Sequence, residues 1–213
     1  MNAKLIINDP AVRREQILAA VTIIFLRHGF HGASMRDICA AADMSPGALY
    51  RYFPSKEHLV DAVVEQHHAR WMATFTTAAQ VGSFFDALDY LTACALDEEE
   101  VNQLPLWLEI AAEAARNPRI AAVRRAHYEV LSQVIADLAA QAITSGELNT
   151  PTNARDVAAV VISAFDGLRL RRGSDSEFDF RRTLRCSVLM LGLALGGKAG
   201  NARIPRAPEE TSA

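Results

Sequence analysis

Residues 34–59 read SMRDICAAADMSPGALYRYFPSKEHL, and this stretch decides the fold. Ser34 is followed three residues later by Asp37, which is the spacing of a capping box and predicts a short helix through residues 38–42. The dipeptide Asp43-Met44 then breaks this helix, because a short polar residue tolerates the left-handed backbone of a tight turn better than most residues do.

The second half of the stretch predicts two further helices. Ser45 as a cap and Pro46 at the first helical position start a very short helix, which Pro54 cannot continue. Ser55 caps a longer helix over residues 56–75 or beyond. Two brief helices on either side of a tight turn predict a helix-turn-helix.

One helix precedes this motif. Asp9 followed by Pro10 is a cap-then-proline start, and Gly29 is expected to stop the helix. The apolar residues that share one face of this helix are Ile17, Val21, Ile24 and Phe25.

Past residue 80 the pattern changes to five longer helices with polar connections. The acidic run 97–100 is expected in a connection or at a helix start, where negative charge suits the helix dipole. The last two helices are apolar on most faces, which predicts that they pack on more than one side. The fold class is therefore all-α, with predicted helices over residues 83–96, 102–116, 118–145, 154–172 and 178–195.

The composition is that of a globular protein: half of the 213 residues are hydrophobic and the net charge is −3. Residues 1–60 carry a balance of +2 and the remainder −5, a mildly basic head on an acidic body. The longest purely apolar stretch, 188–197, is far below the roughly 20 residues that span a bilayer, and no secretory signal is visible, so we expect a cytoplasmic protein. The widely spaced Cys39, Cys94 and Cys186 suit reduced thiols, with a redox switch as the alternative.

Catalytic signatures are missing from the sequence. It holds no Gly-x-Ser-x-Gly, no glycine-rich phosphate loop and no His-Glu-x-x-His. The adjacent His67 and His68 would point about 100° apart on a helix and so could not chelate one metal. We therefore expect neither an enzyme nor a cofactor or metal site.

The stretch over residues 34–59 resembles the N-terminal domain of the TetR family of transcriptional regulators. One departure is Asp43, where a glycine is common in the family's turn. The downstream segment LEIAAEAARNP and residues 166–168 are similar to a common C-terminal variety of the same family. The residues that match the N-terminal pattern are Ser34, Ile38, Ala41, Ser45, Gly47, Leu49, Tyr50, Tyr52, Phe53, Ser55, Lys56, Glu57 and Leu59.

This resemblance implies an all-helical homodimer. It implies a three-helix DNA-binding domain over residues 1–55, a larger ligand-binding and dimerisation domain over 56–196, and a tail over 197–213 that we expect to be disordered. The implied function is that of a repressor, which binds a palindromic double-stranded operator and is released by a small-molecule effector. A transcriptional activator, or a DNA-binding dimer without small-molecule sensing, stays open as an alternative.

The residues expected to contact DNA lie on the two short helices and at the start of the fourth. Small residues at the beginning of a recognition helix let the backbone approach the major groove, and Ala48 could meet a thymine methyl. Arg51 is the candidate for reading a base, and Tyr50 and Tyr52 could donate to phosphates, although both could also be ordinary packing aromatics. The full set is Ser34, Arg36, Ser45, Pro46, Gly47, Ala48, Tyr50, Arg51, Tyr52 and Lys56.

An effector pocket and a dimer interface are expected farther along the chain. A pocket should be mostly apolar with a few orienting polar groups; Glu109, Glu113 or Glu129 in it would favour a cationic ligand, and Arg169 an anionic one. Candidates for the pocket are Trp71, Phe75, Phe85, Tyr90, Trp107, Glu109, Glu113, His127, Tyr128, Phe165 and Arg169. The last two helices are expected to form a four-helix bundle across a two-fold axis, through Val157, Val161, Ile162, Phe165, Gly167, Leu184, Val188 and Leu191.

Overall fold

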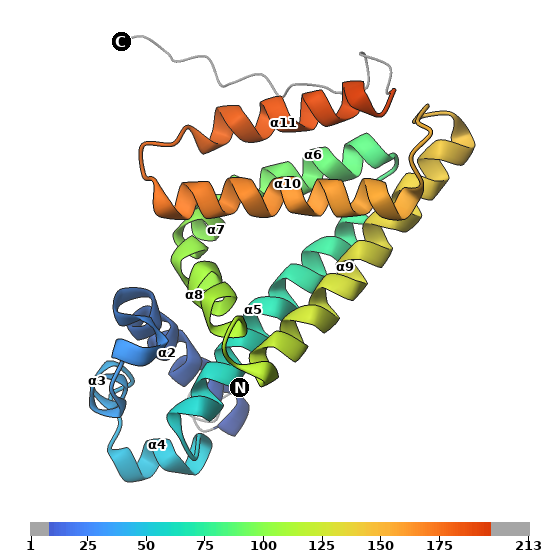
Figure 1. The fold of residues 1–213 in the computed structure, drawn as a ribbon. Coiled ribbons are helices and arrows are strands. Elements are labelled where there is room, and N and C mark those ends of the chain that lie inside the picture. Colours follow the sequence, from blue (N-terminus) through green and yellow to red (C-terminus); the bar gives the residue numbers. More distant parts are fainter. Residues whose placement is uncertain (1–8, 197–213) are drawn as a thin grey trace, which may run out of the picture. The chain divides into compact units, whose positions relative to one another are not determined.

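The computed structural model describes residues 9–196, and these residues form ten α-helices (Figure 1). The predicted all-α class is confirmed. The predicted tail over 197–213 lies outside the described residues. The helices are α2 (Pro10–Gly32), α3 (Met35–Ala41), α4 (Pro46–Tyr52), α5 (Lys56–Ala78), α6 (Phe84–Ala95), α7 (Glu98–Asn102), α8 (Leu104–Ala114), α9 (Pro118–Ser145), α10 (Ala154–Ser174) and α11 (Phe180–Ala194).

The chain divides into two compact units. The first unit runs to Trp71 and also holds Asn102–His127, and the second holds Met72–Val101 and the residues from Tyr128 onward. The first unit is therefore larger than the DNA-binding domain predicted over residues 1–55, because α8 and the first part of α9 pack with the N-terminal helices.

Local capping explains where most helices begin. The side chains of Asp9, Ser34, Ser45 and Ser83 each accept a backbone N–H in the first turn of the helix that follows. Such a bond satisfies one of the donors that a helix start leaves without an intrahelical partner. The four helix starts predicted at these caps are confirmed.

The helical backbone is interrupted at Gly29, the residue predicted to stop the first helix, and one short further turn extends α2 to Gly32. Gly29 has φ +67° and ψ 173°, a conformation that is essentially restricted to glycine. The kink lets Phe30 turn into the core, where it is 2% exposed and packs edge-on against Phe25 with ring centroids 5.0 Å apart. The glycine therefore redirects the chain.

Of two other predictions, one is confirmed and one boundary shifts. The acidic run lies at a helix start, one of the two places predicted for it, because it opens α7, a separate short helix that begins at Glu98. The helix predicted from residue 178 begins at Phe180, because the side chain of Asp179 accepts the N–H of Arg182 and caps it there. Phe178 lies outside the helix, under the guanidinium of Arg171.

The core of the first unit draws side chains from six helices. It is centred on residues of α2 that are at most 2% exposed, and α3, α4, α5, α8 and α9 each add at least one buried residue. Burial of such a side chain contributes about 1.5–3 kcal/mol. Members of this cluster are Ile17, Leu18, Val21, Phe25, Ile38, Leu49, Phe53, Leu59, Val63, Leu106, Ile110 and Ile120.

The second unit packs α11 against α6 and α10. Ala95, Phe180 and Leu184 form a buried cluster there. Gly192 of α11 permits close approach, because a Cβ at this position would lie 2.9 Å from the ring of Phe85. None of the helices in the described part combines the length and hydropathy needed to span a bilayer.

Candidate nucleic-acid interface

The turn between α3 and α4 is short and hydrogen-bonded. The N–H of Met44 donates to the carbonyl of Cys39 at 2.9 Å, and the N–H of Asp43 donates to the carbonyl of Ala40 at 3.3 Å. Asp43 has φ +50°, the left-handed conformation for which glycine is the usual residue. An aspartate tolerates this conformation better than most residues, so the tight turn forms without a glycine.

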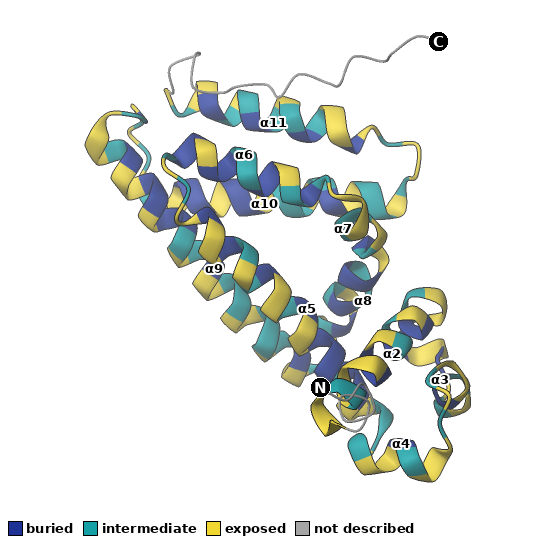
Figure 2. Cartoon of the chain, turned by 180° about the vertical axis from the view of Figure 1, so that it is seen from behind, coloured by how far each residue is buried: buried dark blue, intermediate teal, exposed yellow. Residues whose placement is uncertain are grey.

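Helix α4 is anchored along one side only. Leu49 is fully buried and Phe53, its C-terminal cap, is 2% exposed, with the guanidinium of Arg14 lying 4.9 Å above the ring of Phe53. On the remaining positions of α4 the side chains are exposed or half-buried, as Figure 2 shows, and Tyr50 is 46% exposed. One side of α4 therefore faces solvent, while Leu49 and Phe53 hold the helix against the core.

The predicted DNA-contacting residues of the first unit are all exposed or half-buried. Three are half-buried: Ala48, Tyr52, which packs partly against the core, and Lys56. The exposed ones are Ser34, Arg36, Ser45, Pro46, Gly47, Tyr50 and Arg51.

Several of these residues also have intramolecular partners. Ser34 forms a capping box with Asp37, and its hydroxyl hydrogen bond lowers the pKa of that carboxyl. The ammonium of Lys56 donates to the carbonyl of His31 at 3.1 Å and so joins the start of α5 to the end of α2. An ammonium has three donors, so this bond leaves Lys56 further donors for a phosphate.

A second hydrogen bond between helices was not predicted from the sequence. The guanidinium of Arg13 donates to the carbonyl of Ala42 at 3.3 Å and holds the end of α3 against α2. The sequence offered no signal for this contact, because the two residues are 29 positions apart.

Two carboxylates of α8 connect that helix to α2. The N–H of Phe30 donates to Oε1 of Glu109 at 2.7 Å, and Nε2 of His31 lies 3.0 Å from Oε2 of Glu113. Glu113 also accepts from Arg116 at 3.0 Å and Asn117 at 3.1 Å.

Glu113 is charged although it is buried. Burial pushes the pKa of Glu113 upward, but the hydrogen bonds from Asn117 and His31 and the charge of Arg116 outweigh burial and leave this pKa below its ordinary value. Glu109 and Glu113 thus have structural partners in the first unit, and their place in an effector pocket stays a prediction.

The other pocket candidates fall in both units. In the first unit, Trp71 and Trp107 are buried, the guanidinium of Arg124 lies 5.3 Å from the ring centre of Trp107, and His127 stacks on His68 at 4.6 Å. Burial and then the charge of Arg124 lower the pKa of His68. Within residues 9–196, no group of three His, Cys, Asp or Glu side chains could hold a metal ion.

The second unit holds six candidates. Tyr128 donates its hydroxyl to Asp166, and Phe165 packs against the cluster around Leu184. Phe75, Phe85 and Arg169 are buried, and Tyr90 is half-buried. Which of these residues line a pocket stays a prediction.

Five of the predicted dimer-interface residues are buried inside the protomer: Val157, Val161, Ile162, Leu184 and Val188. They are core residues because α10 packs against α11 within one chain. Phe165 and Leu191 are half-buried, and Gly167 is exposed. The large apolar side chains that the two helices leave exposed are instead Val160, Leu170, Met190 and Leu193.

Comparison with known proteins agrees with this architecture. Residues 17–63 match the family model "Bacterial regulatory proteins, tetR family", and residues 87–205 match "BetI-type transcriptional repressor, C-terminal". The HTH-type transcriptional regulator UidR of Escherichia coli K12 is 36% identical over 142 residues, which cover 66% of this chain and 71% of UidR. The HTH-type transcriptional repressor KstR of Mycobacterium tuberculosis is 28% identical over 186 residues, covering 84% of this chain and 80% of KstR.

The solved structure of Salmonella enterica GusR superposes with a TM-score of 0.69 at 28% identity, over 90% of this chain and 99% of GusR. The helix-turn-helix of α3 and α4, the two family matches and this superposition lead to one assignment. The chain belongs to the TetR family of transcriptional regulators, with a TetR-type helix-turn-helix at its N-terminus and a BetI-type C-terminal domain.

Proposed function

We propose that this regulator is a repressor that binds a palindromic operator as a homodimer and leaves it when a small-molecule effector binds. The observation that carries the proposal is the accessible side of α4, where Tyr50 and Arg51 are exposed while Leu49 fixes the helix to the core. A recognition helix needs this combination, because it must reach base edges in a groove about 12 Å wide without losing its orientation.

The roles of the α4 residues follow from their chemistry. Arg51 would read a base, most naturally guanine, whose O6 and N7 accept two hydrogen bonds from one guanidinium. The hydroxyls of Tyr50 and Tyr52 would donate to phosphates and set the register of the helix. Gly47 and Ala48 would let the backbone come close to the groove.

A second copy of the chain would cover the exposed apolar residues of α10 and α11. Val160, Leu170, Met190 and Leu193 are each between 53% and 69% exposed, and a second copy would remove their apolar surface from water. Two recognition helices related by a two-fold axis would then read half-sites about 34 Å apart, or a multiple of that distance, and this symmetry calls for a palindrome.

Repression is supported by the C-terminal match to a BetI-type transcriptional repressor domain and by the similarity to KstR, a transcriptional repressor. An effector would act by binding more tightly to a conformer in which the half-site spacing is wrong. The candidate residues for its pocket are those named above.

The test is fluorescence anisotropy of the purified protein on its own upstream DNA, across a salt series and with unrelated competitor. We expect dimer-stoichiometric, specific binding, with a log-log salt slope of about −0.9 for each phosphate neutralised. Arg51→Ala should weaken specific binding by about tenfold to a hundredfold and change competitor binding little.

The matched control is Arg125→Ala, which removes an exposed arginine on α9. If Arg51→Ala behaves like this control, Arg51 does not read the operator. If selection from random duplexes also returns no palindrome, dimeric operator recognition is wrong. Effector release is tested separately, by screening compounds for a rise in melting temperature and a loss of anisotropy; a screen without any such compound favours a regulator without small-molecule sensing.

A further inference from the structure

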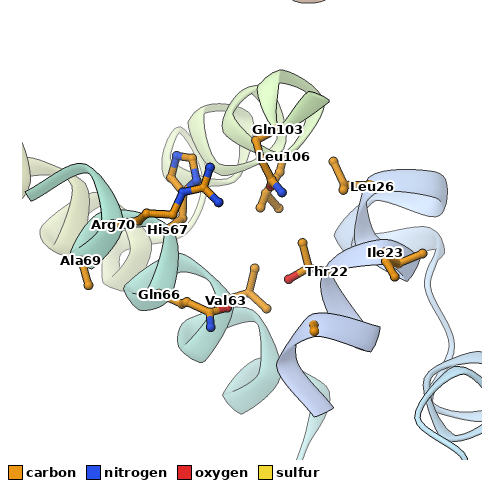
Figure 3. A pocket seen from close by; sticks show the side chains of 11 residues that line it. Thr22, Ile23, Leu26, Val63, Gln66, His67, Ala69, Arg70, Gln103 and Leu106 are labelled. Carbon is orange, nitrogen blue, oxygen red and sulfur yellow. The ribbon is translucent and has the colours of Figure 1, made fainter. Parts of the chain in front are cut away.

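Helices α2, α5 and α8 of the first unit do not fill the space between them. They leave a groove of about 600 Å³, and Figure 3 shows Leu26 of α2, Val63 of α5 and Leu106 of α8 around it. Apolar side chains that face a groove lack contacts on that side, so they hold helices together less firmly than a filled core does. The relative position of the three helices therefore depends more strongly on the contacts they make elsewhere.

One such set of contacts lies at the C-terminal end of α2, where two carboxylates of α8 hold successive residues. The N–H of Phe30 donates to Oε1 of Glu109 at 2.7 Å, and Nε2 of His31 lies 3.0 Å from Oε2 of Glu113. Glu109 and Glu113 are four residues apart and so lie on the same side of α8. The two residues that follow the interruption at Gly29 are thus fixed to α8 by side chains.

The same segment of α2 holds two of the residues predicted to contact DNA. The carbonyl of His31 accepts a hydrogen bond from the Lys56 ammonium at 3.1 Å. Ser34, the cap of α3, follows His31 by three positions, and between them the N–H of Ala33 donates to the carbonyl of Gly29 at 3.3 Å. A shift of this segment would therefore displace both the ammonium of Lys56 and the start of α3.

We propose that Glu109 and Glu113 are positioning residues for operator binding, which act by fixing the segment that holds Lys56. Neither glutamate would touch DNA. Lys56 would make the contact, because its ammonium has three donors and the bond to His31 uses one of them. The proposal rests on the proposed function, since it takes Lys56 to bind an operator phosphate.

Positioning and simple electrostatics predict effects of opposite sign. Removing a carboxylate near DNA takes away a repulsive charge and should strengthen binding. Removing a carboxylate that positions Lys56 should weaken binding, because a phosphate contact is lost. Glu109→Ala should therefore weaken operator binding, whereas Glu65→Ala, which removes an exposed carboxylate of α5 in the same unit, should not.

The test is the salt dependence of operator affinity, measured by fluorescence anisotropy on the full-length protein. Each phosphate contact contributes about −0.9 to the log-log salt slope, so Glu109→Ala should make the slope of a dimer shallower by about 1.8. The affinity that this variant loses should then be about tenfold greater at about 50 mM salt than at about 200 mM.

A double-mutant cycle with Lys56→Gln separates positioning from a general loss of structure. Lys56→Gln alone should make the slope shallower by the same amount as Glu109→Ala. Adding Glu109→Ala to Lys56→Gln should change the slope no further, because both substitutions remove the same contact. A general loss of structure would lower the slope equally in both backgrounds.

A second variant covers the case in which Glu109→Ala does not fold. The side chain of His31 is 71% exposed, so His31→Ala should leave the fold intact while it removes the link to Glu113. It should also make the salt slope shallower, and only where Lys56 is present. The matched control is His28→Ala, an exposed histidine one turn earlier on α2, and circular dichroism at the assay temperature checks that each variant is folded.

The proposal is overturned if the folded variants keep the wild-type slope, or if they lower it equally in the Lys56→Gln background. It is also overturned if the wild type binds its operator specifically and Lys56→Gln keeps the wild-type slope; operator recognition then stands without this network. If the wild type shows no specific binding, the proposed function itself fails, and this proposal fails with it.

Discussion

Replacing Gly29 by alanine should destabilise the protein through two effects that add. The backbone there has φ +67° and ψ 173°, and a side chain in such a conformation costs about 1–3 kcal/mol. An added Cβ would also lie 3.0 Å from Oε1 of Glu109, the oxygen that accepts the Phe30 N–H at 2.7 Å. A hydrogen bond to a charged group contributes about 1.5–3 kcal/mol, so weakening it brings the expected loss to about 3 kcal/mol.

The assay is thermal unfolding followed by circular dichroism at one fixed protein concentration. A loss of about 3 kcal/mol should lower the melting temperature by roughly 6–12 °C in a chain of this size. The control is Gly32→Ala, where the new Cβ would meet only the Cβ of His28 at an ordinary 3.7 Å. That variant should stay within about 1 kcal/mol of the wild type, in the stabilising direction.

A double-mutant cycle separates the two effects. If the Cβ displaces the Glu109 carboxylate, Glu109→Ala should cost less in the Gly29→Ala protein than in the wild type, while the backbone strain remains. The reasoning is refuted if Gly29→Ala and Gly32→Ala melt at the same temperature.

Two further predictions concern the same unit. Asp43→Gly should raise the free energy of unfolding by about 1 kcal/mol, because it relieves the strain of the left-handed backbone at φ +50°. Urea unfolding measures this change. A decrease would show that the aspartate makes a contact that outweighs the strain. Glu113 has a lowered pKa, so its stabilising contribution is present above the ordinary glutamate pKa of about 4.3 and is lost as the pH falls through the lower pKa of the folded state. The stability difference between wild type and Glu113→Gln should therefore shrink as the pH falls below about 4. A difference that does not fall on acidification would mean that the charge of Glu113 does not stabilise the fold.

The features that could be predicted from the sequence are those set within a few residues. The caps at Ser34, Ser45 and Ser83 act over three positions, so the starts of α3, α4 and α6 can be predicted from the sequence. The accessible side of α4 follows from the same stretch, because the apolar Leu49 and Phe53 lie one helical turn apart and are buried, whereas Tyr50 and Arg51 are exposed.

Long-range pairings could not be predicted in this way. Glu109 meets Phe30 across 79 positions, and no local signal marks that contact. Helices α10 and α11 are apolar on several faces, so the sequence could not say which face packs inside the protomer; Val161 and Leu184 do, whereas Met190 stays exposed. The groove is lined by unremarkable residues whose meeting depends on three separate helices.

The first unit is built from two separate segments of the chain, and this limits the design of chimeras between this regulator and its relatives. Leu106, Ile110 and Ile120 belong to the same buried cluster as the core of α2, although they follow it by some 80 to 100 positions. A chimera joined after residue 55 or after Trp71 would pack α2, α3 and α4 against the residues that a relative has in place of these three side chains. Exchange of operator specificity should therefore be attempted by grafting the exposed residues of α3 and α4 onto the native scaffold, because this keeps Leu106, Ile110 and Ile120 with the N-terminal residues of their own cluster.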